Sequence, residues 1–281
     1  MAGKRVLITG ATNGIGLAAA RELLRRGAQV AIVARNQARA AHALAQLDAG
    51  ARVDVLLADL ASQAAVRRLA AEARDRYPRL DVLVNNAGAM NARREMTADG
   101  IERTWAVNHL APFVLTNLLL DRLRESAPAR VITTSSAAHL GARIPFDDLD
   151  GEGGYGPIGL GRYGETKLAN ILFTIELARR LEGSRVTANC FHPGFVASGF
   201  NQNNGTLLAV AMALVRPFSR TPEQGADTLV WLADSEAAGR ETGGYYQNRR
   251  RITPSAAAQD REAAARLWRL SEEQTGRPPH P

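Results

Sequence analysis

The sequence predicts a doubly wound α/β fold, in which a parallel sheet of about seven strands has helices on both faces. Short apolar, β-branched runs alternate with longer stretches whose apolar residues recur at helical spacing. The runs are apolar throughout rather than at every second residue, as is typical of strands covered on both sides. The chain has 281 residues, a suitable length for one domain over 1–281.

The predicted elements alternate in order along the chain. Strands are expected at Arg5–Thr9, Gln29–Ala34, Arg52–Ala58, Asp81–Asn85, Arg130–Thr134, Arg185–Phe191 and, more weakly, Gly244–Gln247. Helices are expected at Ile15–Arg26, Gln37–Leu47, Gln63–Arg76, Gly100–Arg124, Arg162–Leu181 and Pro222–Ala233. Right-handed crossovers between parallel strands then give the doubly wound arrangement.

Two stretches interrupt this alternation. Ala142–Gly161 is rich in Gly, Pro and Asp, and Ala197–Arg220 joins a polar Asn/Gly patch to the apolar run Leu207–Val215. Long loops at the carboxyl edge of such a sheet are commonly functional, so both are predicted to select the substrate. A flexible tail is expected over about 275–281.

Composition excludes several classes of function. The single cysteine, Cys190, allows no intrachain disulfide and no cysteine metal cluster, and no metal is expected. The run Leu207–Val215 is about half the length of a membrane span, and the first strand leaves no room for a signal peptide, so we expect a cytoplasmic protein without membrane insertion. The net charge of +7 comes from dispersed arginines, with one tight cluster at Arg249–Arg251 that we expect to be solvated. We therefore expect an anionic cofactor rather than nucleic acid.

A glycine-rich turn follows the first predicted strand. It reads Thr9-Gly10-Ala11-Thr12-Asn13-Gly14-Ile15-Gly16 and opens a predicted helix. Backbone N–H groups and the helix dipole at such a turn favour an anion. Gly10 permits the turn, Gly14 lets a pyrophosphate approach, and Gly16 lets helix and strand pack closely. The turn predicts a dinucleotide site.

The end of the second strand indicates which dinucleotide binds. Enzymes that prefer NAD usually carry Asp or Glu there, whereas this chain has Ala34 followed by Arg35. An arginine can pair with a 2′-phosphate, so NADP(H) is favoured over NAD(H). The alternative is that Arg35 is a solvated loop residue.

Further motifs appear in order along the chain. They are Asp59-Leu60, Asn85-Asn86-Ala87-Gly88, Asn108, Ser135-Ser136, Tyr163-Gly164-Glu165-Thr166-Lys167 and Pro193-Gly194. With the TGxxxGxG spacing of the glycine turn, this set resembles the short-chain dehydrogenase/reductase family in its compact Rossmann-fold form. The stretches Ser136–Pro145, Lys167–Gly183 and His192–Gly194 are most similar to its retinol-dehydrogenase-like branch.

Tyr163 and Lys167 lie four residues apart on a predicted helix and therefore share a face. A neighbouring ammonium favours the phenolate, so we expect Lys167 to lower the pKa of Tyr163. Only Lys4 and Lys167 among the 35 basic residues are lysine, which supports a specific role for Lys167. The alternative is a buried core tyrosine.

The resemblance completes a catalytic set of Asn108, Ser136, Tyr163 and Lys167. Ser136 would hold the substrate oxygen toward Tyr163, and Ser135 is its rival because adjacent strand residues face opposite ways. Asn108 would support a water-linked proton relay, or cap a helix break, or both. Tyr163 would be the general acid and base of hydride transfer between nicotinamide and a carbonyl or alcohol carbon.

The resemblance also implies a larger set of cofactor-binding residues. In this sequence they are Gly10, Thr12, Asn13, Gly14, Ile15, Gly16, Arg35, Asp59, Leu60, Asn86, Ala87, Gly88, Tyr163, Lys167, Pro193, Gly194, Val196 and Ser198. Asp59 and Leu60 would contact adenine, Asn85 and Gly88 would line the adenosine side, and the segment from Pro193 would flank nicotinamide. His139, His192 and Cys190 are expected to be structural.

Several alternatives remain at this stage. Leu207–Val215 is either a lid over a hydrophobic or aromatic substrate or a packed surface helix. A nucleotide-binding regulator without turnover would carry a broken catalytic set, and all four residues are present. A double-bond reductase would use the same proton donor, whereas an extended sugar-nucleotide epimerase favours a different glycine spacing. Homo-oligomers through the helices at Gly100–Arg124 and Arg162–Leu181 are possible, although the loop before Tyr163 would block one such face.

Overall fold

The computed structural model describes residues 1–47, 53–196 and 219–276. One sheet of eight strands forms its centre, in the order β3-β2-β1-β4-β5-β6-β7-β8. The strands are β1 (Arg5–Thr9), β2 (Gln29–Ala34), β3 (Val53–Leu57), β4 (Val82–Asn85), β5 (Ala129–Thr134), β6 (Val186–Phe191), β7 (Tyr245–Gln247) and β8 (Arg250–Arg251). The first seven are parallel, which confirms the predicted doubly wound sheet.

The eighth strand is a difference from the expected seven. Asn248 and Arg249 both have positive φ, 51° and 61°, and so turn the chain back in a two-residue hairpin. β8 therefore runs antiparallel to β7, with Arg250 opposite Gln247. The arginine cluster is exposed, as expected, but part of it belongs to the sheet.

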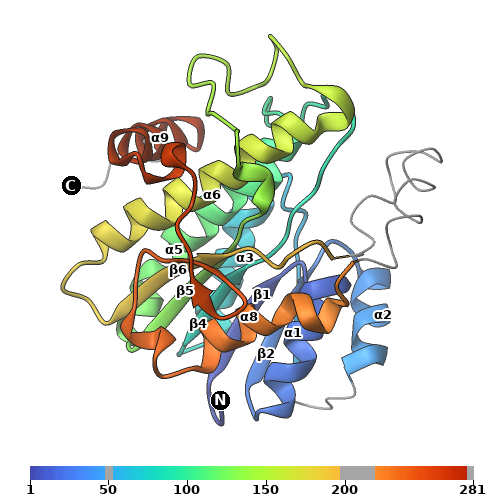
Figure 1. The fold of residues 1–281 in the computed structure, drawn as a ribbon. Coiled ribbons are helices and arrows are strands. Elements are labelled where there is room, and N and C mark those ends of the chain that lie inside the picture. Colours follow the sequence, from blue (N-terminus) through green and yellow to red (C-terminus); the bar gives the residue numbers. More distant parts are fainter. Residues whose placement is uncertain (48–52, 197–218, 277–281) are drawn as a thin grey trace.

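Helices cover both faces of the sheet (Figure 1). They are α1 (Gly14–Arg25), α2 (Gln37–Leu47), α3 (Gln63–Arg76), α4 (Arg103–Trp105), α5 (Ala111–Glu125), α6 (Leu160–Arg180), α8 (Pro222–Asp234) and α9 (Arg261–Gln274). Alternate residues of β1 enter different cores. Leu7 packs with α3 and α5, whereas Val6 and Ile8 pack with α1 and α8.

The helix predicted over Gly100–Arg124 is divided in the structure. It consists of α4, a π-helical turn at Ala106–Leu110, and α5. Pro112 lies in the first turn of α5 and has no N–H to donate to the carbonyl of Asn108. The wider turn therefore occurs where a regular helical hydrogen bond is impossible, and it carries Asn108.

Helix α9 was not predicted, although its sequence carries the signals of a helix. Asp260 caps it by accepting from Ala263 N, and Ala264, Leu267, Trp268 and Ser271 are buried at helical spacing. The Trp268 ring stacks on Phe173 of α6. Thr275, which was expected in the flexible tail, directly follows this helix and is buried.

The two predicted substrate loops differ in what the structure describes. Most of Ala197–Arg220, including Leu207–Val215 and Ser198, lies outside the described residues. The other loop ends in a short 3-10 turn at Pro157–Gly159, and α6 begins at Leu160, two residues before the expected start. No helix among the described residues is both long and apolar enough to cross a membrane.

Candidate functional site

The glycine turn joins β1 to α1 at the carboxyl edge of the sheet. Gly10 has φ +67°, and a Cβ there would lie 2.7 Å from Ala87 Cα. A Cβ on Gly16 would lie 2.3 Å from the carbonyl oxygen of Gly10. Gly14 has φ +53° and begins α1. The turn is therefore closed to larger side chains on its inner side, as expected from the glycine spacing.

The amino end of α1 keeps its N–H groups available. Asn13, the residue before the helix, makes no side-chain cap hydrogen bond, and the first turn has no acidic residue. By contrast, Ser62 caps α3 and Thr221 caps α8. Thr12 and Ile15 complete the turn on either side of Asn13 and Gly14 and are partly exposed. An anion at this end would meet unoccupied donors and the positive end of the helix dipole.

Asn86, the residue after strand β4, braces the glycine turn. Its Nδ2 donates to the carbonyls of Thr9, at 3.2 Å, and Gly10, at 3.1 Å. The Thr9 hydroxyl in turn accepts from the backbone N–H groups of Asn86 and Ala87. Gly88 follows and is partly exposed. These bonds fix the turn without using a charge.

Asn85 differs from the expectation that it lines the adenosine side. Its side chain is buried and donates to the Thr116 hydroxyl of α5 at 2.8 Å. Adjacent strand residues face opposite sides of the sheet, so Asn86 faces the turn while Asn85 faces the core. The Asn85 side chain therefore does not line the adenosine side.

Arg35 and Asp59 follow β2 and β3, the strands beside β1. Both side chains are exposed. Among the described residues, Arg35 has no ion-pair or hydrogen-bond partner. The Asp59 carboxylate accepts from Ala61 N at 3.0 Å, and Leu60 packs partly against the core. Both lie at the same edge as the glycine turn because the strands are parallel.

Ser136 and Tyr163 come together from β5 and α6. Their side chains share a hydrogen bond. The Ser136 hydroxyl also accepts from Ala138 N at 3.2 Å. Ser135 points the other way and donates to the carbonyl of Lys167 at 2.7 Å. Of the two serines, only Ser136 lies at the tyrosine.

Lys167 lies beneath Tyr163 and is buried. Its Nζ is 5.3 Å from the centre of the Tyr163 ring and donates to the carbonyl of Thr134 at 3.1 Å. Burial lowers the pKa of Lys167 to about 8. Burial also raises the pKa of Tyr163 to about 12, while the Ser136 hydrogen bond opposes that rise. The expected lowering of the Tyr163 pKa by Lys167 is therefore not found; desolvation of the phenolate dominates, and the opposing contribution comes from Ser136.

Asn108 joins the π-helical turn to both sides of the site. Its Nδ2 donates to Ala89 O at 2.8 Å and to Thr166 Oγ1 at 2.9 Å, and its Oδ1 accepts from Ala89 N at 2.7 Å. Asn108 thus holds the segment after β4 against α6, one residue from Lys167. Asn108 lies within the π-helical turn, but none of these bonds goes to a backbone group of α4 or α5, so its side chain does not cap the helix break.

The segment after β6 approaches the glycine turn. Gly194 has φ +84° and lies against the Arg220 side chain, which donates to Pro193 O at 3.2 Å. Val196 pairs with Arg220 in a short parallel bridge. A Cβ on Gly225 of α8 would contact Val196 at 2.7 Å and Ile15 at 3.1 Å. Arg220 therefore fixes the turn predicted to flank nicotinamide beside the first turn of α1.

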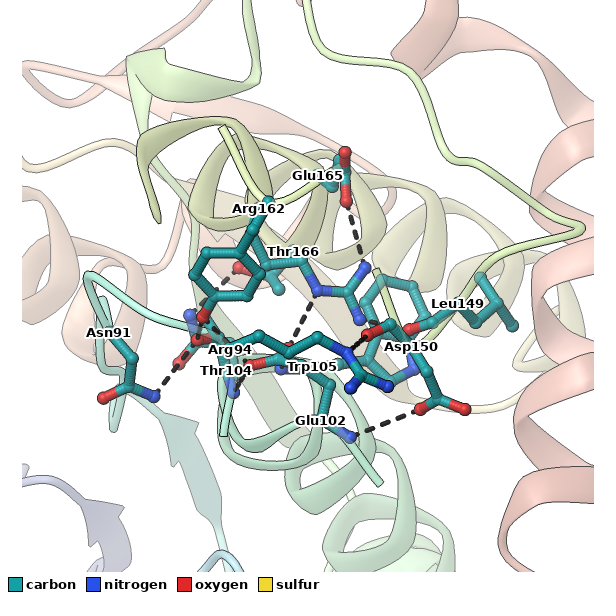
Figure 2. Close-up of polar contacts among 12 residues, drawn as sticks. Asn91, Arg94, Glu102, Thr104, Trp105, Leu149, Asp150, Arg162, Glu165 and Thr166 are labelled. Carbon is teal, nitrogen blue, oxygen red and sulfur yellow. Dashed lines mark hydrogen bonds and ion pairs between the residues drawn. The ribbon is translucent and has the colours of Figure 1, made fainter. Parts of the chain in front are cut away.

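A buried ion pair underlies the start of α6 (Figure 2). Arg162 Nε donates to Glu102 at 2.8 Å, and both side chains are fully buried. Glu102 also accepts from the backbone of Thr104 and Trp105 and from the Tyr155 hydroxyl. The pair thus connects the cap of α4, the loop before α6 and the residue preceding Tyr163.

The loop before Tyr163 is held to this pair along its length. Arg162 also donates to the carbonyl of Leu149 and to Glu165, at 3.0 Å for the latter. Arg94 donates to the carbonyl of Asp150 at 2.8 Å (Figure 2). The guanidinium groups of Arg162 and Arg94 therefore hold the predicted substrate loop through its backbone carbonyls.

Comparison with known proteins agrees with this geometry. A family model described as short chain dehydrogenase matches residues 4–147. Retinol dehydrogenase 12 of Mus musculus is 42% identical over 277 residues, which cover 98% of this chain and 87% of the relative. A Streptomyces sp. (strain C5) protein named as a candidate daunorubicin C-13 ketoreductase is 43% identical over 271 residues, 96% of this chain and 91% of the relative.

The chain belongs to the short-chain dehydrogenase family. It lies in the retinol-dehydrogenase-like branch of these oxidoreductases. The solved active-site complex of Pseudomonas aeruginosa RhlG with NADP matches it with a TM-score of 0.70 and 32% identity, over 87% of this chain and 94% of that one. The resemblance seen in the sequence motifs is confirmed.

Several residues of this dehydrogenase site were missed by the sequence analysis. Glu102 and Arg162 carry no motif, and they are 60 residues apart, so only the buried contact reveals them. His139 and His192, which were expected to be structural, both bond to the backbone beside Ser136, and this contact was not foreseen. Their proximity in sequence to Ser136 and Pro193 was the available signal.

Proposed function

We propose that this protein is an NADP-dependent oxidoreductase that transfers a hydride between nicotinamide and a carbonyl or alcohol carbon. One observation carries the proposal. The hydroxyls of Ser136 and Tyr163 are paired above the buried Lys167, at the same sheet edge as the open glycine turn. This arrangement supplies a proton beside a dinucleotide site, which a carbonyl reduction requires.

The residues present fit a nicotinamide dinucleotide. Gly10 and Gly16 let the turn pack closely against Ala87 and its own backbone, and the amino end of α1 is uncapped. Arg35 offers an exposed guanidinium beside the adenosine end, and the solved RhlG relative holds NADP. Both support NADP(H) over NAD(H). The bound cofactor would supply the hydride, with Pro193, Gly194 and Val196 beside its nicotinamide.

In reduction, Tyr163 donates the proton to the substrate oxygen. Its pKa of about 12 keeps the phenol protonated at neutral pH, which is the form that a proton donor needs. The Ser136 hydroxyl orients the same oxygen. The Lys167 ammonium stabilises the negative charge that proton donation leaves on the Tyr163 oxygen, and it would hold the nicotinamide ribose of a bound cofactor. Asn108 positions Thr166 and the end of a water-linked relay. Oxidation reverses these proton movements.

The proposed substrate is hydrophobic or aromatic. Seven large apolar side chains of the described residues are exposed, and four of them lie on segments that carry the site. These four are Leu140, Ile158, Leu160 and Phe195. The names of two relatives, a retinol dehydrogenase and a candidate daunorubicin C-13 ketoreductase, refer to an alcohol and a ketone. The proposal includes a cytoplasmic location and no nucleic-acid partner.

The test is NADPH consumption with retinal, aromatic ketones, quinones and hydrophobic aldehydes. Tyr163→Phe is expected to lower turnover by roughly 10²- to 10⁴-fold while NADPH still binds. Retained turnover would move the proton donor elsewhere. Product analysis separates carbonyl reduction from double-bond reduction. Binding of NADPH without turnover of any substrate would favour the nucleotide-binding regulator.

Cofactor choice has its own test. Arg35→Ala is expected to weaken NADPH binding by roughly tenfold to a hundredfold, because a charge-assisted bond to phosphate is lost. NADH binding should change little, since that cofactor has no 2′-phosphate. Equal losses for both cofactors would remove Arg35 from the proposed role.

A further inference from the structure

The peptide unit that follows Ser136 is bonded on both sides by histidines. The carbonyl oxygen of Ser136 lies 2.7 Å from His139 Nδ1, and the N–H of Ala137 donates to His192 Nδ1 at 3.2 Å. These two groups belong to the same planar peptide bond. Its rotation would break one or both contacts.

The partners fix the proton position on each ring. A carbonyl only accepts, so His139 Nδ1 carries the proton, and His139 Nε2 accepts from Ser255 N at 3.2 Å. His192 Nδ1 accepts from Ala137, so the proton of the neutral His192 ring is on Nε2. The two rings are therefore neutral and hold opposite tautomers.

The surroundings favour these neutral rings. Burial is the main cause that lowers the pKa of His192 to about 4, and the nearby His139 and Arg220 contribute to the same shift. Burial also lowers the pKa of His139, which packs edge-on against the Tyr245 ring at 5.1 Å. Protonation of either ring would place a donor against a backbone N–H. Neutral imidazoles therefore persist across the ordinary pH range.

We propose that His139 and His192 are positioning residues that form a histidine clamp on the Ser136–Ala137 peptide. The clamp sets the direction of the Ser136 hydroxyl toward Tyr163, and through Ser255 it connects the site to the chain after β8. This inference rests on the proposed function, since it assigns the clamp to a catalytic serine. Neither ring touches substrate in this role.

The first test compares a His139 variant that loses both hydrogen bonds of the ring with one that keeps a donor to the Ser136 carbonyl. His139→Leu removes both bonds of that ring, and it is expected to lower kcat by roughly tenfold to a hundredfold, because the serine is misplaced. KM for NADPH should stay within about twofold, since no cofactor contact is lost. His139→Asn restores an N–H donor near Nδ1 and should recover most of kcat. An unchanged kcat in folded His139→Leu overturns the inference.

Ser255 offers a matched pair of variants. Its φ is −58°, which proline accepts, so Ser255→Pro removes only the N–H that His139 Nε2 accepts. We expect roughly a fivefold to tenfold lower kcat, the effect of one hydrogen bond. Ser255→Ala keeps that N–H, and the Ser255 hydroxyl is buried without a partner among the described residues, so its activity should match the parent. Equal effects of the two variants would contradict the clamp.

A second readout does not depend on turnover. Nitrogen chemical shifts of the imidazole rings report tautomers, and the chain has five histidines that single substitutions assign. His139 is expected as the Nδ1–H form and His192 as the Nε2–H form, both uncharged at pH 7. The reverse tautomers or charged rings would overturn the clamp, even if no substrate of the protein were found. Absence of Tyr163-dependent turnover with these tautomers present would instead reject the proposed function.

Discussion

The glycine turn and the loop before Tyr163 lie on either side of the same site but are held by different forces. The turn is fixed by neutral hydrogen bonds from Asn86 and by contacts that allow no Cβ on Gly10 or Gly16. The loop is fixed by the buried Glu102–Arg162 pair and its partners. A dinucleotide needs backbone that it can approach closely, whereas a proton donor needs one side chain held in one place. Close packing with neutral hydrogen bonds therefore shapes the turn, and a buried ion pair fixes the loop.

Removal of one charge on the loop side is expected to have the largest effect. Arg162→Met leaves the Glu102 carboxylate buried with only neutral donors, which should lower the free energy of unfolding by about 3–5 kcal/mol. Chemical denaturation would measure this loss, and kcat should fall as Tyr163 loses its support. Arg94→Met is the matched control, because Arg94 also donates to a carbonyl of this loop, that of Asp150.

Arg94→Met also removes a positive charge, but from an exposed ion pair, so the comparison with Arg162→Met isolates the effect of burial. The partner of Arg94, Glu152, is 75% exposed, so the loss there should be at most about 1 kcal/mol. Similar losses in both variants would show that the loop, rather than the buried pair, determines stability. The contrast between the two regions would then fail.

A methyl group on the glycine side should cause a smaller loss of stability but abolish cofactor binding. Gly16→Ala places a Cβ 2.3 Å from Gly10 O and 2.5 Å from Asn86 Nδ2, and such overpacking costs about 1–3 kcal/mol. NADPH titration would show lost binding, because the turn must open to fit the methyl group.

Gly183 is the control for this change. It has φ +78°, and no atom lies within 4 Å of the position that a Cβ would take, so Gly183→Ala tests backbone strain alone. That variant should bind NADPH like the parent. Normal NADPH binding by Gly16→Ala would show that close packing is not what shapes the turn.

The smallest expected effect is the change in kcat/KM for NADPH as Lys167, which lies between the two regions, loses its proton. Burial lowers the pKa of Lys167 to about 8, so it is an ammonium below that pH and an amine above it. The value of kcat/KM for NADPH reports groups of the free enzyme and should fall severalfold as pH rises through about 8. A profile that stays flat until pH 10 would contradict the lowered pKa.

The comparison also explains which predictions from the sequence succeeded. Glycine spacing, strand runs and the Tyr163–Lys167 interval are local patterns, and the structure places them as expected. The structure differs from the expected place of the Asn85 side chain and from the expected lowering of the Tyr163 pKa, because both depend on what packs around the side chain. Helix α9 had local signals, Asp260 and the spacing of its buried residues, that were overlooked.

The sequence by itself determined the order of strands and helices, the position of the glycine turn and the family of the chain. These features follow from backbone preferences and from residues close together along the chain. Only the tertiary structure decided that Arg162 pairs with Glu102 and that Ser136 rather than Ser135 faces Tyr163. It also decided that two histidines hydrogen-bond to the peptide after Ser136. Such contacts join segments tens of residues apart, and their energies come from burial, which local sequence does not specify.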